Sequence, residues 1–551
     1  MTRAAAVVRE AWGPVALSVL LTVIVTVLGR HGTDVAAQAY RVKQLHSNGL
    51  QLWNVDWFGG NFPLGYSVLT PLIGSVIGLG ATGIVFAGVA SWTFDRIVKT
   101  TLQRRRWGCW SFVVAVSVQV TVGQVAFLSG EAFALLGVWA LLGRRRLAAS
   151  ALLICAALCS GEALLFATIA IAAWAIHDRE QRWRLAAAVA PAFFIYGLIM
   201  LAFPGTGTFP FGVGAAVGSM GVCAGVLASP LRNSPAVRNG ALLYAGFVVV
   251  ALVLPNPMGA NTSRLATGVG VSVAVCGLEL WIRSRRERFD SRHQAWWRQL
   301  HERARQVLAP ERRRRAVTLA TVAVLGATTW QLAPAFDLLS PASASPATDR
   351  AYYQPLDTEL QTLTRQPVRV EVPPTRLHWE SVFVPTNQIS LARGWDRQLD
   401  RQDNPLFYTN TGLSPDAYRS WLIDNGITYV ALPSARLDYA GAAEAFLIRH
   451  DQVPGLTEVW HTGQWTLWRV NGSPGLVSGP ATLTELHGDE VGLAAIGPGT
   501  ITVRVRYTRY LNVGGSASCV SPTTHGWTSV RATGPGPVLL DTSIAGGPTC
   551  T

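Results

Sequence analysis

The sequence predicts an α-helical polytopic membrane domain of about eleven transmembrane helices, followed by an extracytoplasmic region that begins as α/β and ends as all-β. Three observations predict this fold class. Apolar stretches of roughly 15–25 residues, the length that crosses about 30 Å of hydrocarbon, follow one another from Trp12 to Pro334. Arginines gather in every second connection between these stretches. From Asp337 onward the polarity is ordinary and short β-type runs begin.

The apolar stretches define the predicted spans. They lie near residues 12–29, 67–93, 107–122, 125–143, 147–160, 162–177, 185–203, 209–229, 240–255, 265–282 and 316–334. The first span is longer than the core of a signal peptide, so we expect an anchor rather than a cleaved leader. The predicted domain boundaries are 1–335 for the membrane domain, 336–470 for the α/β domain and 471–551 for the β domain.

The net charge of +14 follows the membrane topology and does not indicate a nucleic-acid partner. Arginine clusters occupy alternate connections, at Arg104–Arg106, Arg144–Arg146 and Arg283–Arg315. The positive-inside rule then predicts a bacterial inner-membrane protein with a cytoplasmic N-terminus and, after an odd number of spans, an extracytoplasmic C-terminal region. The stretch Arg283–Arg315 is either a basic helix lying on anionic lipid or a solvated connector.

The placement of the cysteines predicts one disulfide. Five of the seven cysteines lie in apolar spans, where a thiol behaves as a small hydrophobe. The other two, Cys519 and Cys550, lie in the C-terminal region, in the compartment where disulfides persist. We therefore expect a Cys519–Cys550 bond that stabilises the fold by roughly 3–4 kcal/mol on the chain-entropy model.

The C-terminal region contains two kinds of pattern. The runs Val368–Val372 and Ile427–Leu432 are typical of strands and Asp416–Asp424 of a helix, which predicts an α/β fold to about Val470. Within 501–507, apolar and polar residues then alternate with period two, the mark of a half-buried strand in an all-β fold.

Aromatic and charged residues are mixed in one segment of the α/β region. The segment contains Trp395, Asp396, Arg397 and Asp400, with Tyr408 following. Rings that stack on sugars beside groups that bond hydroxyls are typical of carbohydrate-binding surfaces. The same residues also form structural ion pairs, which is the interpretation we prefer.

The first outer loop carries the clearest functional signal, because it is long, polar and aromatic while most other outer connections are short. Asp34 lies just beyond the first span, and the apolar residues between Val35 and Leu45 share one helical face. This pattern predicts a helix lying along the membrane surface. Trp53, Trp57 and Tyr66 follow, with glycines between them that allow tight turns.

This loop resembles that of the membrane glycosyltransferases of the GT-C fold class. It more closely resembles bacterial membrane proteins described as 6-pyruvoyl-tetrahydropterin synthase-related. The resemblance rests on the acidic Asp34 at the start of a long first outer loop, on the surface helix, and on the W-x-x-x-W-F-G-G-x-x-P-x-G-Y block at 53–66. It covers roughly residues 12–335. Many GT-C enzymes have a paired acidic motif here, whereas Asp34 is followed by Val35.

The resemblance implies that a sugar moves from a polyprenyl-phosphate donor in the membrane lipid to an envelope glycan acceptor on the outer face. Asp34 would act as general base on the acceptor hydroxyl. Arg264, which lies in an outer loop against the positive-inside bias, is the first candidate for the donor phosphate. His31 and Arg41 are weaker candidates for the same contact.

Further candidates could line the same cleft. Trp53, Trp57 and Tyr66 are candidate substrate-binding residues, and Glu162 is a candidate to line an active-site cleft or to hold a divalent metal together with Asp34. The cofactor is therefore unknown, because no His/Cys/Asp cluster has the spacing of metal ligands. Simpler roles exist for each charged residue, since helix ends are solvated and arginines extend toward the membrane surface.

Two other functions share the same architecture. A transporter or flippase of lipid-linked envelope precursors would need the helices but no catalytic carboxylate, and such proteins usually have internal repeats and broken helices. A non-catalytic envelope assembly protein would use its outer region to bind glycan. Loss of sugar transfer on removal of the Asp34 carboxylate is the observation that distinguishes an enzyme from both.

Overall fold

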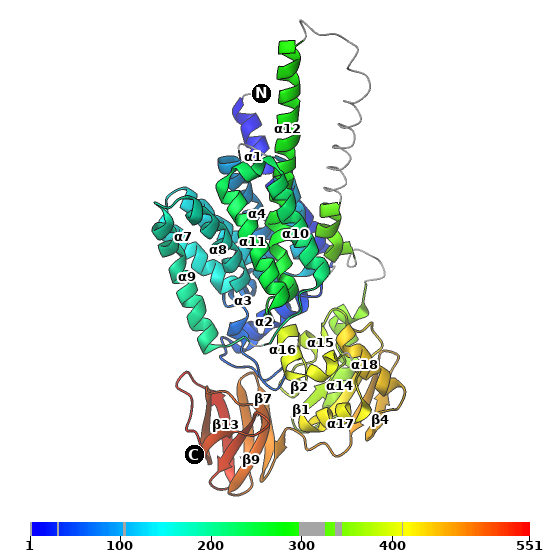
Figure 1. The fold of residues 1–551 in the computed structure, drawn as a ribbon. Helices are drawn as coiled ribbons and strands as arrows, with labels where there is room; N and C mark the ends of the chain where they lie inside the picture. Colours follow the sequence, from blue (N-terminus) through cyan, green and yellow to red (C-terminus); the bar gives the residue numbers. More distant parts are fainter. Residues whose placement is uncertain are drawn as a thin grey trace. The chain divides into compact units, whose positions relative to one another are not determined.

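A computed structural model describes residues 3–29, 32–102, 106–205, 207–296, 326–336, 344–409 and 412–550. His31, residues 297–315 of the basic stretch and residues 316–325 of the last predicted span lie outside these residues. The chain divides into two compact units, whose elements are labelled in Figure 1. Unit 1 comprises Met1–Arg30, Gly80–Leu198 and Phe209–Pro341. Unit 2 comprises His31–Leu79, Ile199–Thr208 and Ala342–Thr551.

Unit 1 is built from apolar helices that fall close to the predicted spans. They are α1 (Arg3–Val27), α4 (Leu79–Thr101), α5 (Arg106–Val122), α6 (Val125–Leu142), α7 (Arg146–Cys159), α8 (Gly161–His177), α9 (Arg182–Ala202), α10 (Val213–Ala228), α11 (Pro235–Val253) and α12 (Val271–Trp296), with a further helical segment at 326–336. Among the described residues, four helices are long and apolar enough to cross a membrane, or five if the broken pair of α3 (Leu69–Ile77) and α4 is one span. Shorter apolar helices accompany them, so a helical membrane protein is confirmed, while the number of spans stays a prediction.

Small side chains hold part of unit 1 together. Where α6, α7, α8 and α9 pack, the buried core contains Ala149, Ala156, Ala188 and Ala192, each at most 2% exposed. Small residues let helix backbones approach closely, which is how helices associate in lipid without a hydrophobic driving force between them. The apolar length of these segments and their alanine content therefore both fit a membrane setting.

The predicted span at 67–93 is wrong in its continuity. The chain breaks at Gly78, whose φ of 83° lies in the left-handed region that glycine adopts without steric cost, so α3 ends before α4 begins. The predicted tenth span at 265–282 falls within the candidate span Gly259–Arg283, and α12 continues as a helix beyond it to Trp296.

The first part of the C-terminal region is an α/β fold, as predicted. Its sheet has the strand order β2-β1-β3-β5-β4, from β1 (Val368–Glu371), β2 (Ile389–Leu391), β3 (Ile427–Pro433), β4 (Leu456–His461) and β5 (Trp465–Val470). Strands β2, β1 and β3 run parallel, and β5 and β4 are antiparallel additions. The helices are α14 (Gln354–Leu363), α15 (Glu380–Phe383), α16 (Arg397–Asp403), α17 (Pro415–Asp424) and α18 (Tyr439–Arg449).

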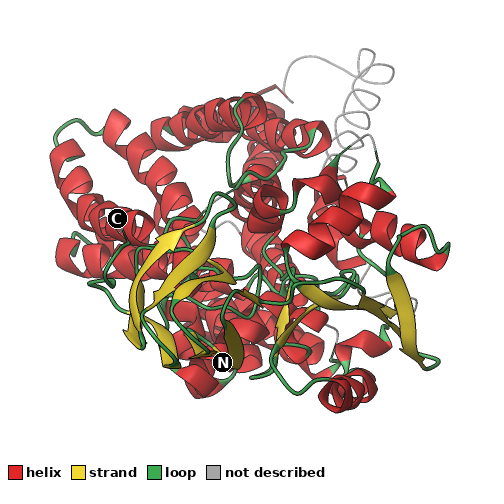
Figure 2. Ribbon diagram, turned by 90° about the horizontal axis from the view of Figure 1, so that it is seen from below, coloured by secondary structure: helices red, strands yellow, loops and turns green. Residues whose placement is uncertain are grey.

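The last part of the chain is all-β, as predicted. Figure 2 shows two groups of strands in the protein, and the all-β part forms one of them. One sheet has the order β10-β13-β8-β7 and the other β11-β12-β9-β6. The strands are β6 (Val477–Ser478), β7 (Ala481–His487), β8 (Glu490–Ala495), β9 (Gly499–Arg506), β10 (Leu511–Gly515), β11 (Ala517–Pro522), β12 (Trp527–Ala532) and β13 (Gly536–Thr542). Side chains of both sheets share one core, which makes a β-sandwich. The alternating residues Ile501, Val503 and Val505 of β9 are at most 1% exposed in it.

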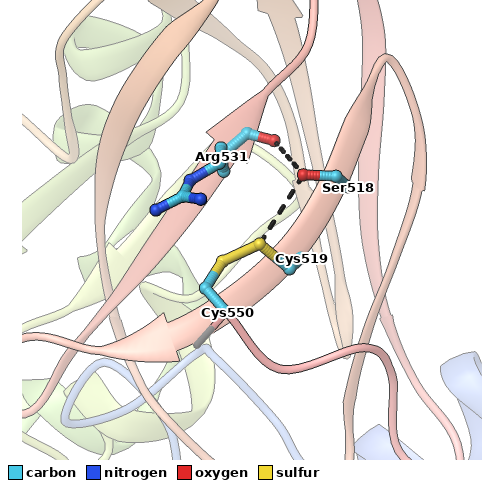
Figure 3. Close-up of a disulfide and its surroundings, with 4 residues drawn as sticks. All are labelled: Ser518, Cys519, Arg531 and Cys550. Atoms are coloured by element: carbon cyan, nitrogen blue, oxygen red, sulfur yellow. Dashed lines mark hydrogen bonds between the residues drawn. A yellow bond between two sulfur atoms is a disulfide. The ribbon is translucent and has the colours of Figure 1, made fainter.

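The predicted disulfide is confirmed. Cys519 of β11 is bonded to Cys550, with 5.0 Å between the two Cα atoms, and Figure 3 shows the bond. Next to it, the backbone N–H of Cys550 donates to the carbonyl of Val520 at 2.9 Å. The bond therefore anchors the end of the chain to an edge strand of the sandwich.

The first outer loop folds into unit 2 and connects its two sheet-containing parts. Trp57 pairs with Leu391 of β2 in a parallel bridge, and Val55 donates its N–H to the carbonyl of Gly488 at 2.8 Å. The carbonyl of Gly59 accepts from the N–H of Arg506 at 2.8 Å. A Cβ at Gly59, whose φ is 73°, would come within 2.9 Å of the Arg369 guanidinium, so glycine is needed for this close approach.

The outer segments that the sequence predicts fall in one unit. Three segments that the sequence predicts to be extracytoplasmic, 30–66, 204–208 and the C-terminal region, have their described residues in unit 2. The short 199–208 segment joins through Tyr510, whose hydroxyl donates to the carbonyl of Ala202 at 2.8 Å. The side of the membrane on which these segments lie is predicted by the charge pattern and stays a prediction.

Candidate functional site

The helix of the first outer loop, α2 (Val35–Asn48), buries polar side chains. Gln38 is 2% exposed, Arg41 is 7% exposed and Gln44 is 6% exposed. The apolar residues that predicted a membrane-surface helix are only half-buried. They are Val35, Ala39, Val42 and Leu45. Buried polar side chains need partners, so this polar face is either a structural network or a binding site.

Asp34 occupies the N-cap position of α2 but does not cap it. Its backbone has φ −86° and ψ −11°, and the carboxylate makes no hydrogen bond to the first backbone N–H groups of the helix. Thr33 Oγ1 lies 3.4 Å from Asp34 Oδ1. Residues spaced by four and then three share one side of a helix, so Asp34, Gln38 and Arg41 lie along one stripe. Helix capping is the most common structural role of an aspartate at this position, and Asp34 does not have that role.

Arg41 is held in this stripe by three contacts. Its Nη1 donates to the carbonyl of Ala37 at 3.1 Å, and its guanidinium lies 3.8 Å from the centre of the Tyr66 ring. Gln38 Nε2 donates to the hydroxyl of Tyr66 at 3.1 Å, which fixes that ring against the helix. The ion pair with Asp396 is long, at 3.9 Å between Nη2 and Oδ2. The structure thus brings together Arg41 and Tyr66, two of the predicted residues, with Asp396 from the α/β region.

A pocket of about 30 Å³ opens beside Arg41. It lies between α2 and the segment leading into α3, and its lining is polar on one side and apolar on the other. The polar members are Arg41, Gln44, Gln51 and Ser67. The apolar members are Leu45, Leu50, Pro63, Leu64, Val68 and Pro71, with Gly49 completing the lining. Mixed pockets of this kind suit a ligand with a polar head and an apolar tail.

The two predicted tryptophans have packing contacts. Trp53 is 5% exposed and packs in the core of the β-sandwich, with its ring edge-on to Phe62 at 4.5 Å between centroids. Trp57 is 2% exposed, stacks on Tyr40 at 3.8 Å, and donates its Nε1–H to the carbonyl of Ser381 at 3.0 Å. These contacts favour structural roles, and substrate binding by either residue stays a prediction.

A polar cluster that sequence reasoning missed lies under Trp57. The hydroxyl of Tyr40 lies 2.8 Å from Asp56 Oδ2 and 2.7 Å from Asn54 Oδ1, so its single proton has two acceptors within reach. Burial raises the pKa of Asp56, and its hydrogen bond from Tyr40 partly offsets this. Lys43 donates to the carbonyls of Val382 and Pro385, at 2.8 and 3.2 Å. The partners of Lys43 are distant from it in sequence, so no local pattern could have identified this cluster.

In unit 1, the predicted residues Arg264 and Glu162 form an ion pair. Arg264 Nη1 lies 2.7 Å from Glu162 Oε2, and the two side chains are 15% and 20% exposed. Asn261 Nδ2 donates to the other carboxylate oxygen at 2.8 Å, and the Arg264 guanidinium lies 5.3 Å from the Phe127 ring centre. The carboxylate thus has a cation and an amide as partners. A role for Arg264 in binding a phosphate, or for Glu162 in lining a cleft, stays a prediction.

The carboxyl ends of the parallel strands in unit 2 carry a second group of charges. His378 lies between Glu380 at 3.4 Å and Asp438 at 3.7 Å, and stacks on Trp395 at 3.5 Å. Arg397 pairs with Asp438 at 2.9 Å. Sequence reasoning singled out Trp395 and Arg397 but missed His378 and Asp438. Structural ion pairing, the preferred interpretation of that segment, agrees with these contacts.

No group of three or more His, Cys, Asp or Glu side chains arranged to hold a metal ion occurs within the part of the chain that the structure describes. His31 lies outside that part, so its predicted contact with substrate is not addressed. Asp34 and Arg41 of unit 2 therefore stand as the candidate site, with Tyr66 and the pocket beside them.

Comparison with protein-family models found no match, and comparison with curated proteins found none either. Among solved structures, the chain is similar to the archaeal oligosaccharyltransferase AglB from Archaeoglobus fulgidus, in complex with an inhibitory peptide and a dolichol-phosphate. The similarity covers 77% of this chain and 69% of that chain, with 10% sequence identity and a TM-score of 0.35. At this TM-score the similarity is distant. The resemblance to 6-pyruvoyl-tetrahydropterin synthase-related proteins stays a prediction from the sequence.

Proposed function

We propose that this membrane protein is a glycosyltransferase of the GT-C class, which moves a sugar from a polyprenyl-phosphate donor to an envelope glycan acceptor. The proposed setting is the outer face of a bacterial inner membrane. The observation that carries the proposal is the stripe on α2, where Asp34 does not cap its helix and shares one face with the buried Arg41. The resemblance of the first outer loop to that of GT-C enzymes supports the same function.

The proposed reaction needs one positioned base. The acceptor hydroxyl attacks the anomeric carbon of the sugar, the bond between that carbon and the phosphate oxygen breaks, and polyprenyl phosphate leaves with the bonding electron pair. The hydroxyl proton passes to the Asp34 carboxylate. Positioned proton transfer of this kind contributes about 10²–10⁴-fold to a rate. Substrate binding by Arg264 and Glu162 is a separate prediction from the sequence.

The test compares two aspartates that both lie at helix starts. Asp34→Asn keeps size and polarity but cannot accept a proton at neutral pH, so we expect at least about 100-fold slower transfer. Asp416→Asn alters an exposed aspartate in the first turn of α17 and should transfer at the wild-type rate. The measurement is sugar transfer by the purified full chain, with a panel of polyprenyl-phosphate sugars and cell-envelope glycan as acceptor. Wild-type transfer by Asp34→Asn contradicts the catalytic assignment.

A flippase of lipid-linked precursors is the second candidate function. The broken pair of α3 and α4 favours it, because transporters use helices interrupted within the membrane. Such a protein moves labelled lipid-linked sugar across proteoliposomes without forming a glycosidic bond. If the protein moves labelled lipid-linked sugar and the wild type transfers sugar from no donor, the transporter assignment replaces the enzyme assignment.

A further inference from the structure

We propose that the pocket between α2 and α3 binds the phosphate group of an isoprenoid phosphate lipid, with Arg41 as the cation and the apolar side of the pocket against the isoprenoid chain. The assignment of this lipid as the donor's carrier rests on the proposed function. The pocket itself is argued from its lining, its buried polar groups and its neighbouring helix terminus.

Two polar groups of the pocket fit a phosphate. Arg41 presents a planar fork of N–H donors, only one of which is used in the bond to Ala37, and no ion pair shorter than 3.9 Å joins it among the described residues. Ser67 lines the pocket, is 5% exposed, and its Oγ has no hydrogen-bond partner in the described part of the chain. An unsatisfied buried hydroxyl costs free energy unless a ligand or water completes it.

Asp396, the carboxylate near Arg41, also caps a helix. Asp396 Oδ1 accepts from the backbone N–H of Leu399 at 3.2 Å and so caps α16, while Oδ2 is the atom 3.9 Å from Arg41. The Asp396 side chain is 27% exposed. A partly solvated carboxylate at this distance neutralises a guanidinium only in part, which leaves attraction for a second anion.

The start of α3 adds positive potential to the same place. The helix begins at Leu69 after Val68 in the N-cap position, and Val68 has no side chain that can cap it. Ser67, Val68 and Pro71 all line the pocket. Leu69 and Thr70 are not among the lining residues and Pro71 has no N–H, so α3 contributes the positive end of its dipole rather than N–H donors. A cation, an unsatisfied hydroxyl and this end of the helix dipole therefore lie at one small space.

The apolar side of the pocket selects a lipid among phosphate compounds. Leu45, Leu50 and Leu64 line it beside the polar groups, and Leu50 is 62% exposed. Along α3, Leu72 is 40% exposed and Val76 is 83% exposed, so apolar surface continues from the pocket. Exposed apolar residues of this kind mark contact with lipid or ligand. A free phosphate would leave this side without a partner.

The pocket is too small for a whole sugar. Its volume of about 30 Å³ has room for a group such as phosphate, and a sugar attached to that phosphate must extend out of it. Asp34 precedes Arg41 by seven residues, which is about 10 Å along a helix axis. This spacing leaves room for a sugar ring between the phosphate at Arg41 and the proposed base at Asp34.

The test measures binding, which does not depend on catalysis. The full chain in nanodiscs of phosphatidylcholine is titrated with farnesyl phosphate, with farnesol, with inorganic phosphate and with phosphatidylglycerol. We expect farnesyl phosphate to bind most tightly, because it alone supplies both the anion and the isoprenoid. Arg41→Gln should weaken its binding roughly ten- to hundredfold, as loss of a charged hydrogen-bonding partner does. Ser67→Asp, which adds a negative charge to the pocket, should abolish binding.

The controls separate binding from folding and from catalysis. Arg531→Gln removes an exposed arginine of the β-sandwich in the same unit and should leave binding unchanged. Thermal unfolding of each variant is measured, and Arg41→Lys, which keeps the charge, replaces Arg41→Gln if the latter does not fold. Asp34→Asn should bind farnesyl phosphate normally while losing transfer.

Four results would overturn the pocket. They are wild-type binding by both Arg41→Gln and Ser67→Asp, equal binding of farnesol and farnesyl phosphate, equal competition by inorganic phosphate, and preferential binding of phosphatidylglycerol. If farnesyl phosphate binds as expected but the wild type transfers no sugar, the pocket stands and the proposed function fails. If the wild type transfers sugar and the Arg41 variant has an unchanged KM for the donor, the enzyme stands and the pocket fails.

Discussion

Among the buried arginines of unit 2, Arg393 and Arg41 lie in very different surroundings. Arg393 is 3% exposed, and its guanidinium forms two bonds to Asp400, at 3.1 and 3.0 Å, and one to Glu444 at 2.7 Å. Glu371 lies 3.6 Å away. Arg41 is 7% exposed, and its one ion pair among the described residues is the long contact with Asp396.

The difference separates a structural cation from one available to a ligand. Burying a charge costs several kcal/mol unless partners compensate it, and the fold supplies Arg393 with three carboxylates. Burial raises the pKa of Glu371, with neighbouring Glu444 adding to the effect, and this favours its neutral form and reduces the negative charge of the network. Arg41 has one carbonyl, one ring and a carboxylate at 3.9 Å as partners, and a phosphate would supply the close anion that Arg393 already has.

The largest expected effect breaks the compensated network. Arg393→Met keeps much of the side-chain volume but leaves Asp400 without its cation, so we expect the free energy of unfolding to fall by about 3–5 kcal/mol. Thermal unfolding of the purified chain, followed by tryptophan fluorescence, measures the change. Arg41→Gln is the matched variant and should cost less than about 1 kcal/mol, because it removes a long ion pair, one hydrogen bond and one ring contact but leaves no buried carboxylate without a close cation. Equal losses would remove the distinction between the two arginines.

The next effect concerns Arg264 of unit 1, which resembles Arg393 in having a close carboxylate. Because Glu162 holds it at 2.7 Å, we expect Arg264→Ala to raise the KM for the lipid-linked donor only about threefold. Glu162→Gln releases the guanidinium and should lower that KM by a similar factor. Donor titrations of the two variants test this. A rise larger than that caused by Arg41→Gln would move the phosphate contact from unit 2 to unit 1.

Local patterns predicted most of the elements. The apolar lengths gave the helices of unit 1, and period-two alternation gave β9, because side-chain direction repeats with the backbone geometry of each element. The same reasoning missed the break at Gly78, since an isolated glycine in an apolar run is compatible with an unbroken helix. The disulfide was predictable because compartment and count left only two cysteines to pair.

Contacts between distant segments were not predictable. Arg369 of β1 donates from Nη2 to the carbonyl of Arg504 at 2.7 Å, and its guanidinium lies 5.6 Å from the Trp527 ring centre. Nothing in the local sequence around 369, 504 or 527 indicates that they meet. The same limit applies to the candidate site. Asp34, Arg41 and Tyr66 were found by residue type, but Ser67 and the contact between Asp396 and Arg41 were found only through the fold.

The smallest expected effect concerns His378, a titratable cation that lies beside two carboxylates. Burial alone would lower the pKa of His378, but its hydrogen bonds with Asp438 and Glu380 outweigh burial and raise it. Protonated His378 therefore stabilises the folded state. This contribution is complete below the ordinary histidine pKa of about 6.5 and is lost as pH rises through the raised value in the folded protein. The same hydrogen bond lowers the pKa of Asp438 despite its burial, so Asp438 titrates far below this range.

His378→Gln removes the titration while keeping a polar side chain. We expect the wild type to be more stable than the variant at about pH 6, by more than it is at about pH 9. Tm values of the two proteins across this range measure the difference. Loss of the stack on Trp395 lowers Tm equally at each pH, so only the titration of His378 makes the difference depend on pH. The same comparison in an Asp438→Asn background should show a much smaller pH dependence. There, His378→Gln should change Tm by nearly the same amount at both pH values. A pH-independent difference would mean that Asp438 and Glu380 hold a neutral imidazole, and that compensation of cations in this unit is confined to its arginines.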